Sequence, residues 1–307
     1  MLRIRLVEEK IAELYPEQEM RCPVHLCIGQ EAVPAGVSAH LKPSDYVMSA
    51  HRSHGHYLAK GGDLKAMFAE LYGKASGCAH GKGGSMHLVD PSRAMMGSSA
   101  LVGGTIPLAA GAALASQFQK KNHVAVAFFG DAATEEGIFQ ESLNFAALKK
   151  LPVLFVCENN FLATHTPLSE RQAVDNIWER GKIYGVPGFR IDGTSAVEVY
   201  QTATEAVKRA RRGEGPTLLE CQAYRWREHV GPQFDYDLGY RTKEELDDWV
   251  RRCPIVRMEK IFKEKTLFSE PELQKLRREI EAQIEEAVAF AKASPFPEPS
   301  ELLTAVD

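Results

Sequence analysis

The chain has 307 residues, of which 25% are charged, and a formal net charge of -4. This length is enough for one large α/β domain or two smaller ones, and the slight acidity excludes the basic footprint of a nucleic-acid-binding protein. The apolar stretches are interrupted well short of a membrane span, and the first residues lack the apolar core of a signal peptide. We therefore expect a soluble protein without membrane contact, located in the cytoplasm or, failing that, in an organelle matrix.

The first third of the chain is predicted to consist of helices separated by loops. Residues 2–14 have the spacing of a short amphipathic helix, which we expect to pack outside the main sheet. Helical segments alternate with a histidine-rich loop in residues 23–71, and residues 74–91 contain too much glycine for a regular element, which indicates an ordered loop. Residues 105–120 are predicted to form a helix with Pro107 in its first turn, where a missing amide hydrogen is tolerated.

The middle of the chain alternates between strand and helix patterns. Residues 124–129 and 153–157 are apolar and strand-like, and the segment 137–150 between them carries apolar side chains at helical spacing. A second repeat follows, with strands at 189–191 and 217–222 around a helix at 196–211. This alternation predicts an α/β fold with a doubly wound, mostly parallel sheet that has helices on both faces.

The last part of the chain is less regular. Residues 225–240 carry charges, proline and glycine without periodicity, so we expect a mobile loop at the carboxyl edge of the sheet. A long helix with an apolar stripe is predicted at 270–293, followed by an extended docking tail at 294–307 whose apolar residues are Leu302, Leu303 and Val306. We divide the chain into an N-terminal helical arm (1–20), an α/β domain (21–265) and a C-terminal helix with its tail (266–307).

Two polar residues follow the two central strands. Asp131 comes after the first strand and Asn160 after the second, and a right-handed crossover brings both strand ends to one edge of the sheet, where open parallel sheets bind ligands. If the strands are neighbours, an octahedral cation can bridge the two side chains, and one carboxylate with one amide oxygen suits Mg²⁺ holding a phosphate. Taken alone, the pair could also be ordinary turn capping.

The residues around this pair resemble a known family. Gly130-Asp131-Ala132 followed by Asn159-Asn160 resembles the thiamine diphosphate motif, which runs from Gly-Asp-Gly to Asn-Asn. Further segments look like the alpha subunit of thiamine diphosphate-dependent 2-oxo acid dehydrogenases of the pyruvate and acetoin dehydrogenase type; these are residues 51–56, 81–87, 134–137, 144–148, 151–153, 224–226 and 239–242. The similarity covers residues 20–250 in the right order, so the thiamine diphosphate-binding fold is expected.

The resemblance implies a set of site residues. A magnesium ion would be held by Asp131, Asn160 and the main-chain carbonyl of Leu162. Arg52 is the first candidate donor to the cofactor's diphosphate, and His54 and His229 are the catalytic candidates lining the channel. The remaining cofactor-binding candidates are His51, Leu101, Val102, Gly103, Gly130, Ala132 and Ala133, with Asp131, Asn160 and His229 counted among them as well. His51 stands where relatives often have tyrosine.

The resemblance also implies a reaction and a partner. Thiamine diphosphate with Mg²⁺ would serve decarboxylation of a 2-oxo acid or cleavage of an acyloin. The family's activating glutamate comes from a beta subunit, so we expect this chain to be incomplete alone and to form an α2β2 assembly, with a lipoyl-bearing acyltransferase as a further candidate partner. A two-subunit carboligase that forms acyloins or transfers acyl groups, and a scaffold that does not use the cofactor, remain alternatives.

Several local features have other readings or depart from the family pattern. His51, His54 and His56 could form a zinc cluster, but they match no helical metal motif, and the six cysteines are scattered without a Cys-x-x-Cys pair. The glycines at 81–84 do not make a P-loop and are expected to border the substrate channel.

Ala132 replaces the last glycine of the motif and requires a negative φ. The dipeptide 227–228 is expected to put charge beside the channel, which would disfavour pyruvate.

Overall fold

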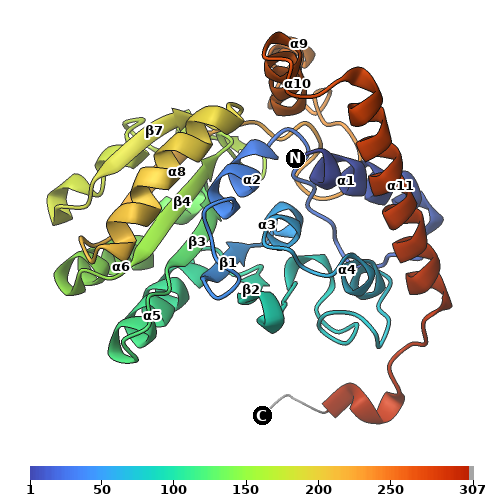
Figure 1. Ribbon diagram of the computed structural model, residues 1–307, viewed down its shortest axis with the longest axis horizontal. Coiled ribbons are helices and arrows are strands. Elements are labelled where there is room, and N and C mark those ends of the chain that lie inside the picture. The colour runs from blue at the N-terminus through green and yellow to red at the C-terminus, as the bar shows by residue number, and fades with distance from the viewer. Residues whose placement is uncertain (304–307) are drawn as a thin grey trace.

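The computed structural model describes residues 1–303, and its centre is a parallel sheet of six strands (Figure 1). In spatial order the strands are β2 (Met95–Ser99), β1 (Tyr46–Ala50), β3 (Ala125–Gly130), β4 (Val153–Asn159), β8 (Thr217–Gln222) and β7 (Gly188–Asp192). All neighbouring pairs in this sheet are parallel. A separate antiparallel pair is formed by β5 (Leu162–Ala163) and β6 (Thr166–Pro167).

Helices connect and cover these strands. The α-helices are α1 (Leu2–Leu14), α2 (Ala32–Ser38), α3 (His54–Ala59), α4 (Leu64–Leu71), α5 (Thr105–Phe118), α6 (Gly137–Lys149), α7 (Leu168–Arg171), α8 (Ala196–Arg211), α9 (Lys243–Arg251), α10 (Pro254–Glu264) and α11 (Glu270–Ala293). Short 3-10 turns lie at Tyr15–Glu17, Gly84–Met86, Pro91–Arg93, Asp131–Glu135, Ile177–Glu179, Lys182–Tyr184 and Pro299–Leu303. In the part of the chain that the structure describes, no helix has the length and apolar character needed to cross a bilayer.

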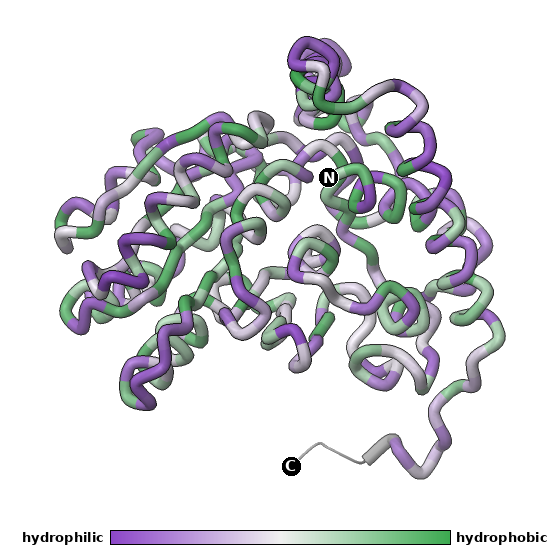
Figure 2. Tube along the Cα trace, in the orientation of Figure 1, coloured by the Kyte–Doolittle hydropathy of each residue, from purple (hydrophilic) through white to green (hydrophobic). Residues whose placement is uncertain are grey.

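Alternate residues of the central strands enter two different cores. In β3, Val126 and Phe128 belong to a core shared with α1, α4, α8 and α11, whereas Ala127 and Phe129 belong to a core shared with α5 and α6. Successive side chains of a strand point to opposite faces, so a strand covered on both sides must be apolar throughout. The predicted α/β fold with helices on both faces is therefore confirmed, and Figure 2 shows hydrophobic positions along the central strands and mostly hydrophilic ones along the outer helix α11.

The predicted elements agree with the structure in the middle of the chain and differ before it. The central strand, helix and strand lie within one or two residues of the expected bounds, and β3 and β4 are direct neighbours. Strands β1 and β2 were not predicted. Their sequences, YVMSA and MMGSS, are only five residues long, and serine or glycine interrupts each apolar run after two or three residues, so neither has the longer run that identifies a buried strand.

The glycine-rich loop after α4 is ordered by a buried carboxylate, in agreement with the prediction. Glu70, at 1% exposure, accepts hydrogen bonds from the backbone N–H groups of Ala79, Gly81, Gly83 and Gly84 at 2.8 to 2.9 Å. Four donors on one side chain fix a segment that has little regular secondary structure of its own.

The C-terminal tail folds back onto this loop. The carbonyl oxygen of Pro295 accepts from the backbone N–H of Ala75 at 3.0 Å, and the Lys74 ammonium lies 3.9 Å from the ring centroid of Phe296. The tail was expected to be extended, but Pro299–Leu303 forms a 3-10 turn, so that expectation is wrong for this segment. Residues 304–307, including Val306, lie outside the described residues.

Candidate active site

A cavity of about 170 Å³ lies at the carboxyl ends of the central strands. Its lining comes from the ends of β1, β3 and β4 and from loops far apart in the sequence. The lining residues are Gln30, Ala50, His51, Arg52, His56, Val102, Gly103, Phe129, Gly130, Asp131, Ala132, Ala133, Glu158, Asn160, Leu162, Ala163, Thr164 and His229. The structure thus brings most of the sequence-predicted site residues to one cavity.

Asp131 and Asn160 lie in this cavity because β3 and β4 are adjacent and in register, with Gly130 opposite Glu158. Burial raises the pKa of Asp131, and the guanidinium of Arg171, which pairs with the carboxylate, opposes that effect. Asn160 Nδ2 donates to Gln30 Oε1 at 3.2 Å, and Asn160 Oδ1 accepts from the backbone N–H of Leu162 at 3.3 Å. Both side chains are therefore held in place.

The donor set at this point fits a hard divalent cation. Buried Asp131 lines the same cavity as Asn160 and Leu162, and Mg²⁺ prefers the carboxylate, amide and main-chain carbonyl oxygens that these residues carry. The backbone of Ala132 does not have a positive φ, so alanine meets the backbone condition for replacing the usual glycine.

Arg52 supplies a buried positive charge beside the metal-ligand candidates. Its Nη1 donates to the carbonyl oxygen of Leu26 at 2.6 Å, which fixes the guanidinium at the cavity wall. Burial lowers the pKa of Arg52 to about 10, so the group remains cationic at neutral pH. A fixed guanidinium matches the geometry of phosphate oxygens.

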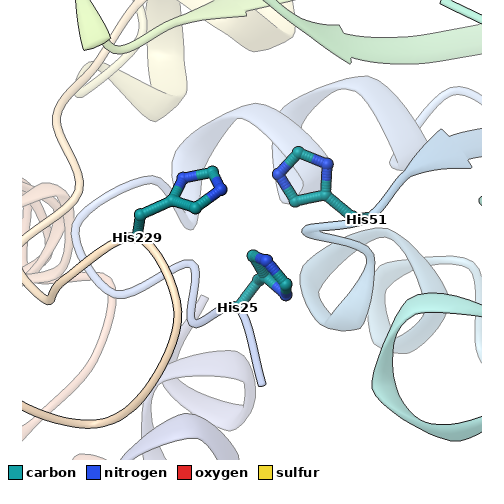
Figure 3. A group of neighbouring side chains, drawn as sticks. All are labelled: His25, His51 and His229. Carbon is teal, nitrogen blue, oxygen red and sulfur yellow. The ribbon is translucent and has the colours of Figure 1, made fainter. Parts of the chain in front are cut away.

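Three histidines meet next to Arg52 (Figure 3). The ring centroids of His25, His51 and His229 lie 4.6 to 5.4 Å apart, and each ring offers a nitrogen within 4.8 Å of the others. Burial first, and then the Arg52 charge, lowers their pKa values to about 2, about 4 and about 3 in that order. Three neutral imidazoles beside a guanidinium can donate hydrogen bonds, and the nearby positive charge favours an anion over a zinc ion.

The histidines that lie together in the structure differ from the group that is close in sequence. The candidate zinc group His51, His54 and His56 does not converge, whereas His25, which was missed, joins His51 and His229. His25 stands alone in an apolar segment before α2, so no spacing connects it with histidines that follow other elements.

His54 is placed outside the cavity. Its Nδ1 contacts Glu8 Oε1 at 2.5 Å, its Nε2 contacts Ser85 Oγ at 2.7 Å, and its side chain has no exposure. Both ring nitrogens are occupied by protein partners, so the expectation that His54 acts on a ligand is not supported by this geometry; the residue links α1 to the glycine-rich loop.

The turn after β2 contributes only part of the predicted contact. Val102 and Gly103 line the cavity, and Gly103 has a φ of +76° with the Glu136 side chain in close contact, a position that favours glycine. Leu101 does not line the cavity and is 71% exposed. Its side chain forms part of the outer surface of this chain, and its contact with the cofactor stays a prediction.

Two further segments that were expected beside the channel do not line this cavity. Arg227 donates to the carbonyl oxygen of Pro232 and covers the Phe234 ring, and Glu228 accepts from the backbone N–H of Gln233, so neither charge lines the cavity. Residues 81–84 of the glycine-rich loop are also absent from the lining.

The cavity contains one carboxylate that sequence reasoning passed over. Glu158 is buried, lines the cavity and lies 3.2 Å from His56 Nε2, while His56 Nδ1 lies 2.7 Å from Ser49 Oγ. Its only sequence signal was its position directly before Asn159-Asn160.

A parallel α/β sheet with this motif at its carboxyl edge defines a class of cofactor-dependent enzyme, and comparison with known proteins identifies the family. Residues 1–300 match the family described as dehydrogenase E1 component. The chain belongs to this family, which confirms the resemblance to alpha subunits of thiamine diphosphate-dependent 2-oxo acid dehydrogenases and the expected class of oxidoreductase.

Individual relatives fall into two groups. The chain is 43% identical over 310 aligned positions to the alpha subunit of an acetoin:2,6-dichlorophenolindophenol oxidoreductase of Bacillus subtilis, covering 100% of this chain and 91% of the relative. It is 42% identical to a chloroplastic pyruvate dehydrogenase E1 component subunit alpha-3 of Arabidopsis thaliana, covering 99% and 72%. A second acetoin oxidoreductase alpha subunit, from Cupriavidus necator, is 42% identical, covering 100% and 91%.

Proposed function

We propose that this chain binds the diphosphate of thiamine diphosphate through Mg²⁺ and, together with a beta subunit, cleaves the bond beside the carbonyl of a short 2-oxo acid or acyloin. The observation that carries the proposal is the convergence of Asp131, Asn160 and Leu162 on one cavity with Arg52 and His229. The names of the relatives support an acetoin-type or pyruvate-type substrate and an alpha subunit that needs a partner.

Each wall of the cavity has a separate task in this proposal. Asp131, Asn160 and the Leu162 carbonyl would hold the cation, while Arg52 would donate to phosphate oxygen. His51 and His229 are neutral at pH 7 because burial lowers the pKa of each, so each can donate one N–H to an anionic oxygen without adding charge. Phe129 and Val102 would form the apolar side of the site.

When bound, thiamine diphosphate supplies the nucleophilic carbon and the electron sink that such cleavage requires. The protein contributes position and electrostatics. We assign the glutamate that activates the cofactor's aminopyrimidine to the beta subunit, in an α2β2 assembly. No residue of this cavity is given that role. We propose that the protein is located in the cytoplasm and that a lipoyl-bearing acyltransferase accepts the acyl group.

Substrate choice between an acyloin and a 2-oxo acid is a second part of the proposal. Because Arg227 and Glu228 do not line the cavity, they give no reason to disfavour pyruvate. Product analysis of the assembled enzyme with acetoin and with pyruvate, with and without a lipoyl acceptor, distinguishes cleavage from carboligation.

Calorimetry of the assembled enzyme with thiamine diphosphate and Mg²⁺ tests cofactor binding. Asp131→Ala removes the anionic oxygen ligand and should raise the Kd by more than about 100-fold, since loss of even an outer contact of a metal site weakens it about 10- to 100-fold. Asp237→Ala, which changes an exposed aspartate, is the matched control. Absence of binding by the wild type, or equal binding by Asp131→Ala, would favour the scaffold reading.

A further inference from the structure

Gln30 is a buried amide that the cofactor motif does not include. It lies in the segment before α2, has no exposure and lines the cavity. Its Oε1 accepts from Asn160 Nδ2 at 3.2 Å, and its Nε2 is buried without a hydrogen-bond partner among the described residues. A buried donor without an acceptor is uncommon in folded proteins, and one at the wall of a cavity points to a ligand acceptor.

The backbone that carries Gln30 is held firmly from two sides. Glu31 Oε1 accepts from the backbone N–H of Gly29 at 3.0 Å and from Arg5 Nε of helix α1 at 2.6 Å, with both charged side chains buried. Gly29 has a φ of +98°, and a Cβ at this position would lie 2.4 Å from Trp226 Nε1. Little room therefore remains for the segment to move, so the direction of the Gln30 amide is set by the fold.

The two ends of this amide suit two different partners. The oxygen end takes one hydrogen from Asn160, which fixes the Asn160 amide so that its nitrogen faces Gln30 and its oxygen faces away from Gln30. Gln30 lines the wall that also contains Arg52 and Asp131, and its Nε2 is a buried donor without an acceptor among the described residues. A cation cannot accept these hydrogens, whereas an anionic oxygen can.

We propose that Gln30 is a positioning residue for Asn160 and also donates a hydrogen bond from Nε2 to an anionic oxygen of the cofactor's diphosphate. This inference rests on the proposed function. Gln30 would thus be a neutral residue beside the metal-ligand candidates. It would act on the cation site through Asn160 and on the phosphate directly.

The test measures the Kd of thiamine diphosphate for the assembled alpha and beta subunits at saturating Mg²⁺. Gln30→Met keeps the length of the side chain and removes both polar ends, and it should raise the Kd about 10- to 100-fold, the range for one hydrogen bond to a charged group. Gln274→Met makes the same chemical change on the exposed side of α11 and should leave the Kd unchanged. Thermal melting without cofactor establishes that each variant is folded.

A double-mutant cycle separates positioning from direct donation. Asn160→Ala removes the Nδ2 donor and adds no charge or acceptor, so in this background Gln30→Met can lose only its own contact with the cofactor. The effect of Gln30→Met should then be smaller by about threefold or more than in the wild-type background, because residues that act on each other are not additive.

The outcomes distinguish this inference from the function on which it rests. An unchanged Kd in folded Gln30→Met, or full additivity with Asn160→Ala, would overturn the dual role of Gln30 while the wild type still binds. Failure of the wild-type assembly to bind thiamine diphosphate would overturn the proposed function and the inference together.

Discussion

Asp235 neutralises two buried arginine side chains in the loop that contains the cavity residue His229. The side chains of Arg225 and Asp235 have no exposure and that of Arg241 is also buried, and one carboxylate serves both guanidiniums. Arg225 Nη1 donates to Asp235 Oδ2 at 2.9 Å, and Arg225 Nη2 donates to the carbonyl oxygen of Thr164, a cavity residue, at 2.8 Å. Asp235→Ala would leave two buried cations without their counter-ion.

The expected loss follows from this arrangement. Removing one partner of a buried ion pair destabilises a protein by about 3–5 kcal/mol, because the remaining charge stays desolvated. Since two guanidiniums share Asp235, we expect the upper end of that range, partly offset by the carbonyl oxygens that each arginine also contacts. Asp235→Asn retains an acceptor and should lose less.

Two measurements test this prediction. Urea denaturation reports the free energy of unfolding, and limited trypsin digestion reports local opening through the rate of cleavage after Arg227. Asp237→Ala, at an exposed aspartate of the same loop, is the control. If Asp235→Ala unfolds within about 1 kcal/mol of the wild type and is cleaved no faster, buried-pair energetics do not hold this loop and the reasoning is wrong.

Two further predictions concern stability. Burial keeps the pKa values of His25, His51 and His229 below the ordinary 6.5, so the unfolded chain binds more protons than the folded one below that pH. The free energy of unfolding should therefore be highest above pH 6.5 and fall on acidification towards pH 4, by up to about 1.4 kcal/mol per pH unit for the well-buried His25. Midpoints of urea unfolding measured across this pH range test the prediction. A His25→Asn variant whose stability falls with the same slope as the wild type would contradict it. Glu70→Ala removes the shared acceptor of the glycine-rich loop, so hydrogen exchange at residues 79–84 should accelerate, and unchanged protection would show that the carboxylate does not order the loop.

The sequence was most informative where local pattern and spatial arrangement coincide. The central strand, helix and strand had strong apolar periodicity, and the crossover rule then placed Asp131 and Asn160 at one edge without further information. Gly130 and Ala133 followed because they are chain neighbours of Asp131.

Residues that reach the cavity by long-range packing could not be found this way. Gln30 and His25 precede a helix in a segment without strand or motif signals. Gln30 lines the cavity and His25 packs against the lining residues His51 and His229 because α1 and Trp226 fix that segment. At His54 and Leu101 the family resemblance implied a place beside the cofactor, but neither residue lines this cavity. Spacing along a chain gives register within an element, not the direction of side chains in irregular loops.

The wall of the cavity is drawn from segments that the ribosome makes at very different times. A nascent chain that has emerged as far as β8 already contains all six strands, yet it still lacks His229 and the arginine at position 241 that anchors the loop. We therefore expect the sheet to form before the pocket can retain a vitamin-derived ligand, so that loading with cofactor follows synthesis.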